Sequence, residues 1–301
     1  MAPASDEQPG RKDPLVGVAA SGAAAIGWGS AGVMASEASA SGIVLTFWRT
    51  WLGAVFLVAG LAARRRFLTV RTIRLSLIGG LLLSADMSLF FSSIKLSGVA
   101  VPTVIGALQP ALVMVLAHVL LGERLDRTSV LWTFVAIAGV IVIALGGGVP
   151  SRHALEGDLL AVLSLLAWSG YFIAAKSVQP RIAALDYTAG VTIVAAAATT
   201  FVVLLARVSV TNVAAGDWLW IGLLAVVPSC AHLLMNVAQG HLDVSIASLI
   251  GSANPIVAAV GAYLFLDQSL NAVQIAGGVV SIIAIGIVAA RRQQPAASPV
   301  E

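Results

Sequence analysis

Long apolar stretches run through most of the chain, separated by short clusters of charged residues, proline and glycine. A bilayer core about 30 Å thick is crossed by about 20 apolar residues in helical form. On that measure the pattern predicts ten membrane-spanning helices joined by short loops. They cover residues 15–36, 43–63, 75–94, 99–121, 130–148, 159–175, 188–206, 218–237, 244–266 and 272–290.

The composition supports the same fold class. Of the 301 residues, 59% are hydrophobic and 10% are charged, whereas soluble domains have about 25% charged residues. One soluble core of this length cannot bury so much apolar surface, so lipid is the expected solvent. We therefore predict an all-α integral membrane protein. Cys230 is the only cysteine, so the chain cannot form a disulfide framework.

The basic residues indicate an orientation rather than a nucleic-acid partner. With the N-terminus inside, 13 of the 17 Lys and Arg residues flank inner ends of spans, three flank outer ends, and Arg49 lies within the second span. The positive-inside rule then predicts that both termini are cytoplasmic. We expect a multi-pass protein of the plasma membrane. Residues 1–14 are expected to be a disordered tail and residues 291–301 a second tail.

The chain also repeats itself. Residues 98–125 match residues 243–270 without a gap, at an offset of 145 residues. This offset predicts two units of five helices, at residues 15–148 and 157–290. Because five is an odd number, the second unit enters the membrane in the opposite sense, which is the inverted repeat that alternating-access transporters use. The alternative is a duplication that only enlarged the bundle.

Three segments resemble a known family: GALQPALVMVLAHVLLGERL, FVAIAGVIVI and EGDLLAVLSLLAWSGYFIAAK. Their order, spacing and duplication are similar to those of the EamA-type drug/metabolite transporter superfamily. The resemblance implies a carrier of ten helices in two inverted repeats, which moves small metabolites through a cavity between its halves. The second unit departs from the pattern, since Asp267-Gln268 stands where the first has Gly122-Glu123. We expect Glu123 to cap a helix end by pairing with Arg124, Arg127 or a neighbouring loop.

Asp86 stands in the middle of an apolar run, LLLSADMSLFF. It lies between Arg74 and Lys95, near the centre of the third predicted span, where an aspartate costs about 2.5–3.5 kcal/mol. Ionisable groups at such positions are usually functional. Asp86 is therefore a candidate for proton coupling or for binding an amine. The alternative is a structural hydrogen bond to Ser84, Ser88 or another helix.

Two further ionisable residues are candidates for the same site. The repeat offset aligns His232 with the neighbour of Asp86, so the two residues are expected to face one cavity, where His232 relays protons. The alternative is a histidine bonded to a backbone carbonyl that Pro228 leaves free. Arg49 either binds a carboxylate or phosphate or extends to the membrane interface. His118 is expected at the interface, and His153 and His241 in loops.

Matched prolines and several aromatic residues complete the set of candidates. Gln109-Pro110 and Asn254-Pro255 occupy equivalent places in the two units, where proline interrupts the helical hydrogen bonds. Gln109 and Asn254 then either offer amide groups to a polar substrate or lie at simple kinks. Three aromatic residues are candidates for the walls of the site or for packing: Trp28, Trp168 and Tyr171.

The main rival to a carrier is an intramembrane enzyme or a membrane protein without transport activity. The sequence has no zinc-protease motif, nucleophile elbow, metal-ligand cluster or phosphate-binding loop. We therefore predict a secondary transporter, not an enzyme, that exports small metabolites such as amino acids or related amines. No cofactor and no metal are expected. The expected partners are a small-molecule substrate, protons and lipid, while the oligomeric state is left open.

Overall fold

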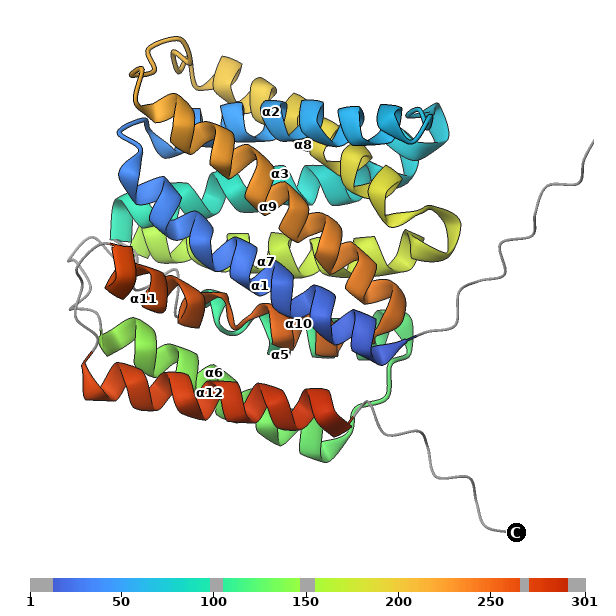
Figure 1. Ribbon diagram of the computed structural model, residues 1–301, viewed down its shortest axis with the longest axis vertical. Helices are drawn as coiled ribbons and strands as arrows, with labels where there is room; N and C mark the ends of the chain where they lie inside the picture. The colour runs from blue at the N-terminus through green and yellow to red at the C-terminus, as the bar shows by residue number, and fades with distance from the viewer. Residues whose placement is uncertain (1–12, 98–104, 147–154, 266–270, 292–301) are drawn as a thin grey trace, which may run out of the picture.

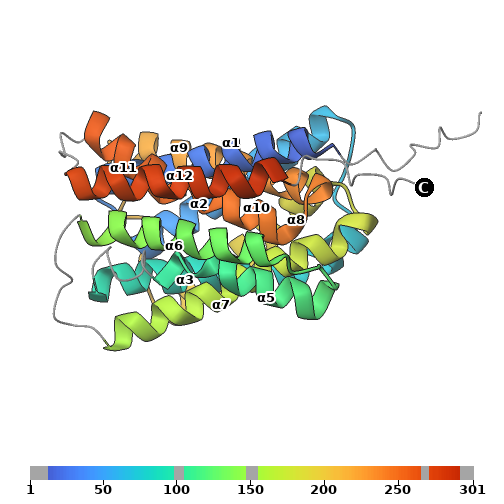
Figure 2. The same ribbon diagram turned by 90° about the horizontal axis from the view of Figure 1, so that it is seen from below.

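The computed structural model describes residues 13–97, 105–146, 155–265 and 271–291, and all regular elements within these ranges are helices. The expected tails fall almost wholly outside the described residues, and so do His153 and Asp267-Gln268. Figures 1 and 2 show helices lying side by side and running roughly along one direction. In chain order the elements are α1 (Pro14–Glu37), α2 (Gly42–Ala63), α3 (Val70–Ser97), α5 (Gln109–Leu121), α6 (Arg127–Gly146), α7 (Leu155–Val178), η1 (Gln179–Arg181), α8 (Ala184–Leu205), α9 (Asp217–His241), α10 (Val244–Gly251), α11 (Asn254–Phe265) and α12 (Ala272–Arg291).

Six described helices are long and apolar enough to cross a membrane, namely α1, α2, α3, α7, α8 and α9. Four further apolar stretches in the described ranges are shorter, at Gln109–Leu121, Arg127–Val142, Val244–Val257 and Ala272–Val288. Six of the ten predicted spans are therefore confirmed as helices of membrane-crossing length, and the described part of the chain is that of an all-helical, multi-pass membrane protein.

Two predicted spans are interrupted at their prolines. The segment predicted as a single helix over 244–266 is divided into α10 and α11, with turns at Ser252 and Ala253. Pro255 has no N–H to donate to the preceding turn, so the helix restarts there. In the first unit α5 likewise begins at Gln109, with Pro110 in its first turn. The two proline positions thus mark two helix starts.

The packing partners form matched sets. α1 packs on α9 in the same way that α7 packs on α3, while α2 packs on α8 and α6 on α12. Small residues allow the closest approaches, because apolar side chains gain little from leaving lipid and van der Waals contact must hold the helices together. A Cβ at Gly139 of α6 would lie 2.5 Å from the carbonyl oxygen of Gly277 in α12.

Large apolar side chains face outward, and hydroxyl groups lie inside. Val119, Phe201 and Leu204 are among many exposed large hydrophobic side chains. Thr46 and Thr50 are buried on α2, and each donates a hydrogen bond to a backbone carbonyl one turn earlier. This arrangement suits a lipid solvent, in which polar groups must find their partners within the protein.

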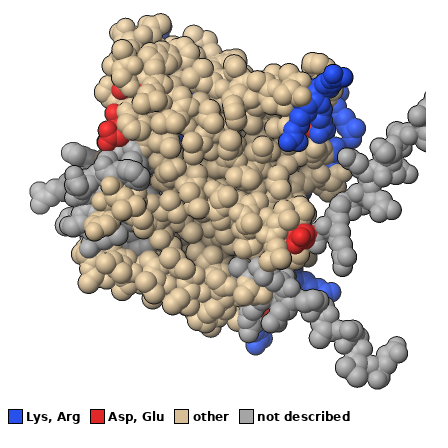
Figure 3. All heavy atoms as spheres, in the orientation of Figure 1, with Lys and Arg blue, Asp and Glu red and all other residues tan. Residues whose placement is uncertain are grey.

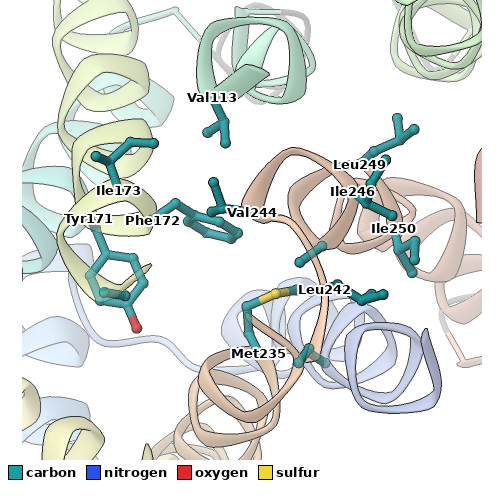
Figure 4. Close-up of a cluster of buried hydrophobic side chains, with 14 of the residues drawn as sticks. Val113, Tyr171, Phe172, Ile173, Met235, Leu242, Val244, Ile246, Leu249 and Ile250 are labelled. Carbon is teal, nitrogen blue, oxygen red and sulfur yellow. The ribbon is translucent and has the colours of Figure 1, made fainter. Parts of the chain in front are cut away.

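The largest buried apolar cluster joins several helices from both ends of the sequence. Figure 4 shows Val113 of α5 facing Phe172 of α7 and Val244 of α10, with Met235 of α9 nearby. Tyr171 lies at the edge of the same cluster, so the apolar core adjoins the aromatic candidates described below.

Charged side chains gather at the two ends of the bundle and leave a tan band between them on the face shown in Figure 3. We call one end the basic end. It holds the connections α2–α3, α5–α6, α7–α8 and α9–α10, and both the start of α1 and the end of α12 lie there (Figure 1). The Lys and Arg residues in these connections or next to them include Arg64, Arg65, Arg66, Arg71, Arg124, Arg127, Lys176 and Arg181.

Candidate functional site

Asp86 is held by a neighbouring helix. It lies on α3, half-buried, and its Oδ1 accepts a 2.6 Å hydrogen bond from the hydroxyl of Ser164 on α7. The two serines that the sequence suggested as partners are oriented otherwise. Ser84 shares a 3.1 Å hydrogen bond with Thr199 of α8, and the Ser88 hydroxyl is buried without a partner. Close packing of α3 on α7 thus supplies the contact that fixes the carboxylate.

Arg49 is the basic counterpart of this carboxylate. It lies on α2, half-buried, and interacts electrostatically with both Asp86 and His232. Within the described residues the Arg49 and Asp86 side chains form no direct ion pair. The neighbouring Trp48 and Trp51 bond elsewhere, to Val210 and Thr200. Arg49 is therefore within electrostatic range of both other ionisable candidates.

The aromatic candidates and His232 meet in one cluster, which we call the aromatic cluster: Trp28 of α1, Trp168 and Tyr171 of α7, and His232 of α9. The His232 ring centroid lies 5.2 Å from that of Trp28, 5.7 Å from that of Trp168 and 5.7 Å from that of Tyr171. Trp28 and Trp168 meet edge to face at 5.2 Å, and Trp168 stacks on Tyr171 at 5.4 Å. These spacings are typical of favourable aromatic pairs.

Two buried nitrogen atoms in the aromatic cluster have no hydrogen-bond partner among the described residues: Nδ1 of His232 and Nε1 of Trp28. The carbonyl partner that the sequence suggested for His232 is thus absent at Nδ1. Buried polar atoms without partners are rare and often belong to functional sites. His232 Nδ1 can form a hydrogen bond to a substrate or water or take up a proton, whereas the Trp28 indole N–H can only donate a hydrogen bond.

The interruption between α10 and α11 lies against the aromatic cluster. A Cβ at Gly29 of α1 would lie 2.5 Å from the carbonyl oxygen of Asn254, and one at Gly251 would lie 3.3 Å from the ring of Trp28. The backbone of Asn254 therefore lies beside the aromatic cluster. Gln109 is buried on α5 with its amide nitrogen unpartnered. In the described residues, no hydrogen bond joins the Gln109 or Asn254 side chain to Asp86.

Sequence reasoning missed a buried polar stripe on α9. His232, Asn236 and Gln239 follow one another at helical spacing and are all buried. The Asn236 amide donates to Thr188 at 2.9 Å and to the Tyr171 hydroxyl at 3.3 Å. The spacing on one helix face is a signal that the sequence contains. Ser164 gave no such signal, because its partner is 78 residues away.

Glu123 connects the end of α5 to the start of α10 at the basic end. Gly122 ends α5 in the left-handed region, at φ 70°, a conformation that suits glycine. The chain then turns, and the Glu123 carboxylate accepts hydrogen bonds from the backbone N–H of Val244 at 2.7 Å and from the hydroxyl of Ser245 at 2.6 Å. Glu123 thus caps a helix end, as expected, but that helix is α10 in the second unit, and within the described residues neither Arg124 nor Arg127 forms an ion pair with it. Nearby, His118 is exposed and contacts the Glu123 carbonyl.

Within the described ranges, no group of three or more His, Cys, Asp or Glu side chains is placed to hold a metal ion. The site is instead one carboxylate, one guanidinium and one imidazole beside aromatic rings. Such a set can bind charged and apolar parts of a small molecule and can exchange protons.

Comparisons with known proteins agree with this architecture. The EamA-like transporter family matches the chain twice, over residues 15–145 and 155–290, and the chain belongs to that family. A protein of Bacillus subtilis (strain 168), called the uncharacterized transporter YyaM, is 25% identical over 205 residues, covering 64% of this chain and 67% of its own. A crystal structure described only as that of a protein aligns with a TM-score of 0.80 and 18% identity, covering 94% of this chain and 100% of that one. The chain is therefore a multi-pass membrane transporter, and its family is one of transporters rather than enzymes.

Proposed function

We propose that the protein is a secondary carrier that exports small amine-bearing metabolites, such as amino acids, by alternating access around Asp86. The observation that carries the proposal is the Asp86–Ser164 hydrogen bond in the middle of the bundle, with Arg49 in electrostatic range. A lone carboxylate at this depth is costly unless it has a ligand or a proton.

Each part of the site suits one part of such a substrate. The Asp86 carboxylate pairs with an ammonium group, and the Arg49 guanidinium pairs with a carboxylate. Trp28, Trp168 and Tyr171 accommodate an apolar side chain or add cation–π attraction to the ammonium group. The pair of opposite charges therefore favours a zwitterion, and the aromatic cluster favours one with an apolar portion.

Proton coupling would use the same residues. Asp86 and His232 are both titratable groups, and both interact with the fixed positive charge of Arg49. A proton on Asp86 removes the charge that holds an ammonium group, so protonation and substrate release become linked. Inward flow of protons would then drive export.

The proposed architecture is ten spans in two inverted repeats. Its support lies in the matched packing of α1 on α9 and α7 on α3. In addition, the Ser281 hydroxyl donates to the Ala136 carbonyl at 3.0 Å, and these two positions are separated by 145 residues, the offset of the repeat. A residue can meet its own equivalent only near a two-fold axis. The helix starts at Gln109 and Asn254 resemble the broken helices that line carrier sites.

The proposed orientation places the basic end in the cytoplasm of the cell, as the positive-inside rule requires. Both the start of α1 and the end of α12 lie at that end (Figure 1). Export from the plasma membrane is proposed from the resemblance of the chain to metabolite carriers.

The test is transport by the purified protein in proteoliposomes, with a panel of amino acids, other amines and carboxylates without amines. The proposal expects transport of one or more amine-bearing solutes, faster with a proton gradient than without one. Transport restricted to solutes without an amine would contradict the proposed substrate class, and no transport of any solute would contradict the carrier mechanism itself.

A further inference from the structure

A polar cavity lies at the basic end, and its lining includes neither Asp86 nor any residue of the aromatic cluster. It has a volume of about 360 Å³ and is formed by the α2–α3 connection and the segment that leads from η1 into α8. That volume falls within the range of small-molecule sites. The lining residues include Arg66, Arg71, Arg181 and Asp186. Figure 3 shows Lys and Arg atoms gathered at the end where α2 passes into α3.

The charges in this cavity are unbalanced. Asp186 pairs with Arg66, and it is the one carboxylate in the lining. Within the part of the chain that the structure describes, no carboxylate pairs with Arg71 or Arg181. Two guanidinium groups are therefore left facing a concave, polar space. Guanidinium groups bind phosphate oxygens through paired, charge-assisted hydrogen bonds.

The backbone adds to the positive potential. α8 begins at the cavity, and Ala183, which lines it, is an N-cap without a side-chain hydrogen bond. The first N–H groups of a helix that lack a side-chain cap favour an anion. On the other wall Thr69 already caps α3 by accepting from Thr72 N–H at 3.1 Å. The start of α8, whose first turn also carries Asp186, and the two arginines without a carboxylate partner in the described residues thus lie at one cavity.

The surroundings indicate that the anion belongs to a lipid. Phe67, in the cavity lining, is 76% exposed, and neighbouring Val70 is 69% exposed. Behind them, Leu57 and Leu61 of α2 pack with Leu185 of α8 in a small apolar cluster. The cavity therefore lies at the ends of membrane helices, beside apolar side chains that enter the bilayer surface. Basic pockets in that position bind anionic lipid headgroups.

We propose that this cavity binds the phosphate of an anionic phospholipid, with Arg71 and Arg181 as its principal ligands. The site is separate from the transport site and does not depend on which solute is carried. Lipid occupancy would hold the α2–α3 connection against the start of α8.

The test measures lipid binding to the purified full-length protein by native mass spectrometry, with phosphatidylglycerol and phosphatidylcholine as probes. Wild type is expected to prefer phosphatidylglycerol, and the double variant Arg71→Gln/Arg181→Gln to lose that preference by about tenfold or more. The matched control is Arg124→Gln/Arg127→Gln, which removes the same charge at the same end and should keep the preference. Loss of the preference in the control, or its survival in the Arg71/Arg181 variant, would overturn the proposal.

A third variant separates lost binding from lost folding. Asp186→Asn removes the carboxylate that competes for Arg66, so it should bind phosphatidylglycerol more tightly than wild type. Misfolding cannot produce such a gain, and unchanged or weaker binding would count against the site. Competition with inorganic phosphate distinguishes the source of the anion. Displacement of phosphatidylglycerol by equimolar phosphate would overturn the lipid assignment, whereas lipid that stays bound supports it.

Discussion

The hydroxyl of Ser164 on α7 donates a 2.6 Å hydrogen bond to Oδ1 of Asp86 on α3. It leaves Oδ2 without a hydrogen-bond partner in the described part of the chain. One oxygen atom is therefore positioned by the protein, and the other is available to an ammonium group or a proton. This division explains how a carboxylate can be both fixed and reactive within the bundle.

Replacement of Ser164 with Ala should weaken substrate binding without abolishing transport. A hydrogen bond to a charged group contributes about 1.5–3 kcal/mol, so we expect the KM to rise about tenfold or more. The matched control on the same helix is Ser177→Ala, because Ser177 is exposed and bonds only to a backbone carbonyl one turn earlier. Equal KM values for the two variants would show that the Ser164 bond is not used in binding.

The aromatic cluster should report substrate binding through tryptophan fluorescence. Trp28 and Trp168 both touch the His232 ring, so a substrate at that place alters their emission. We expect the substrate-induced change to disappear in the double variant Trp28→Phe/Trp168→Phe. It should persist in Trp218→Phe, whose ring packs on Trp48 away from the aromatic cluster. If the fluorescence change persisted in Trp28→Phe/Trp168→Phe and disappeared in Trp218→Phe, the binding site would lie elsewhere.

Loss of the Glu123 carboxylate should loosen the start of α10. The cap is expected to contribute about 0.5–2 kcal/mol, so Glu123→Ala should speed amide hydrogen exchange at Val244 and Ser245 about 2- to 30-fold. Glu37→Gln is the control, since Glu37 is exposed at the end of α1. Unchanged exchange at Val244 in the Glu123 variant would mean that another group satisfies this N–H.

Two glycines on α1 should respond oppositely to the same substitution. A Cβ at Gly29 would lie 2.5 Å from the Asn254 carbonyl oxygen, while one at Gly22 would have no neighbour within 4 Å. Gly29→Ala should therefore separate α1 from α11 and lower the melting temperature in detergent. Gly22→Ala should leave that temperature unchanged or raise it, because alanine favours helix by up to about 1 kcal/mol. A stable Gly29→Ala protein would contradict the close packing described for this contact.

Much of the fold follows from patterns within single segments. Apolar length locates α1, α2, α3, α7, α8 and α9, and proline without an N–H predicts the interruptions before Pro110 and Pro255. The interruption at Pro255 was expected, but residues 244–266 were still predicted as one span, because the apolar run continues through the break. A hydropathy scale measures how apolar the residues are, and it does not detect the backbone hydrogen bond that Pro255 cannot form.

The contacts within the site depend on packing and were less predictable. The location of Asp86, and the repeat offset that aligns His232 with its neighbour Met87, suggested a common site, and both interact with Arg49. The Ser164 partner and the Asn236 network with Tyr171 require knowledge of which helices touch. A polar residue on a helix indicates that a partner is needed, but only the tertiary fold identifies it.

The central claim is that Asp86 carries the coupling between substrate and proton, and one measurement tests it most directly. Uptake of the identified substrate into proteoliposomes is recorded with and without a pH gradient for wild type, Asp86→Asn and the exposed control Glu156→Gln. The account predicts that Asp86→Asn transports about tenfold more slowly or worse and no longer responds to the gradient, while Glu156→Gln behaves as wild type. An Asp86→Asn protein with the wild-type rate and the wild-type response to pH would contradict the account.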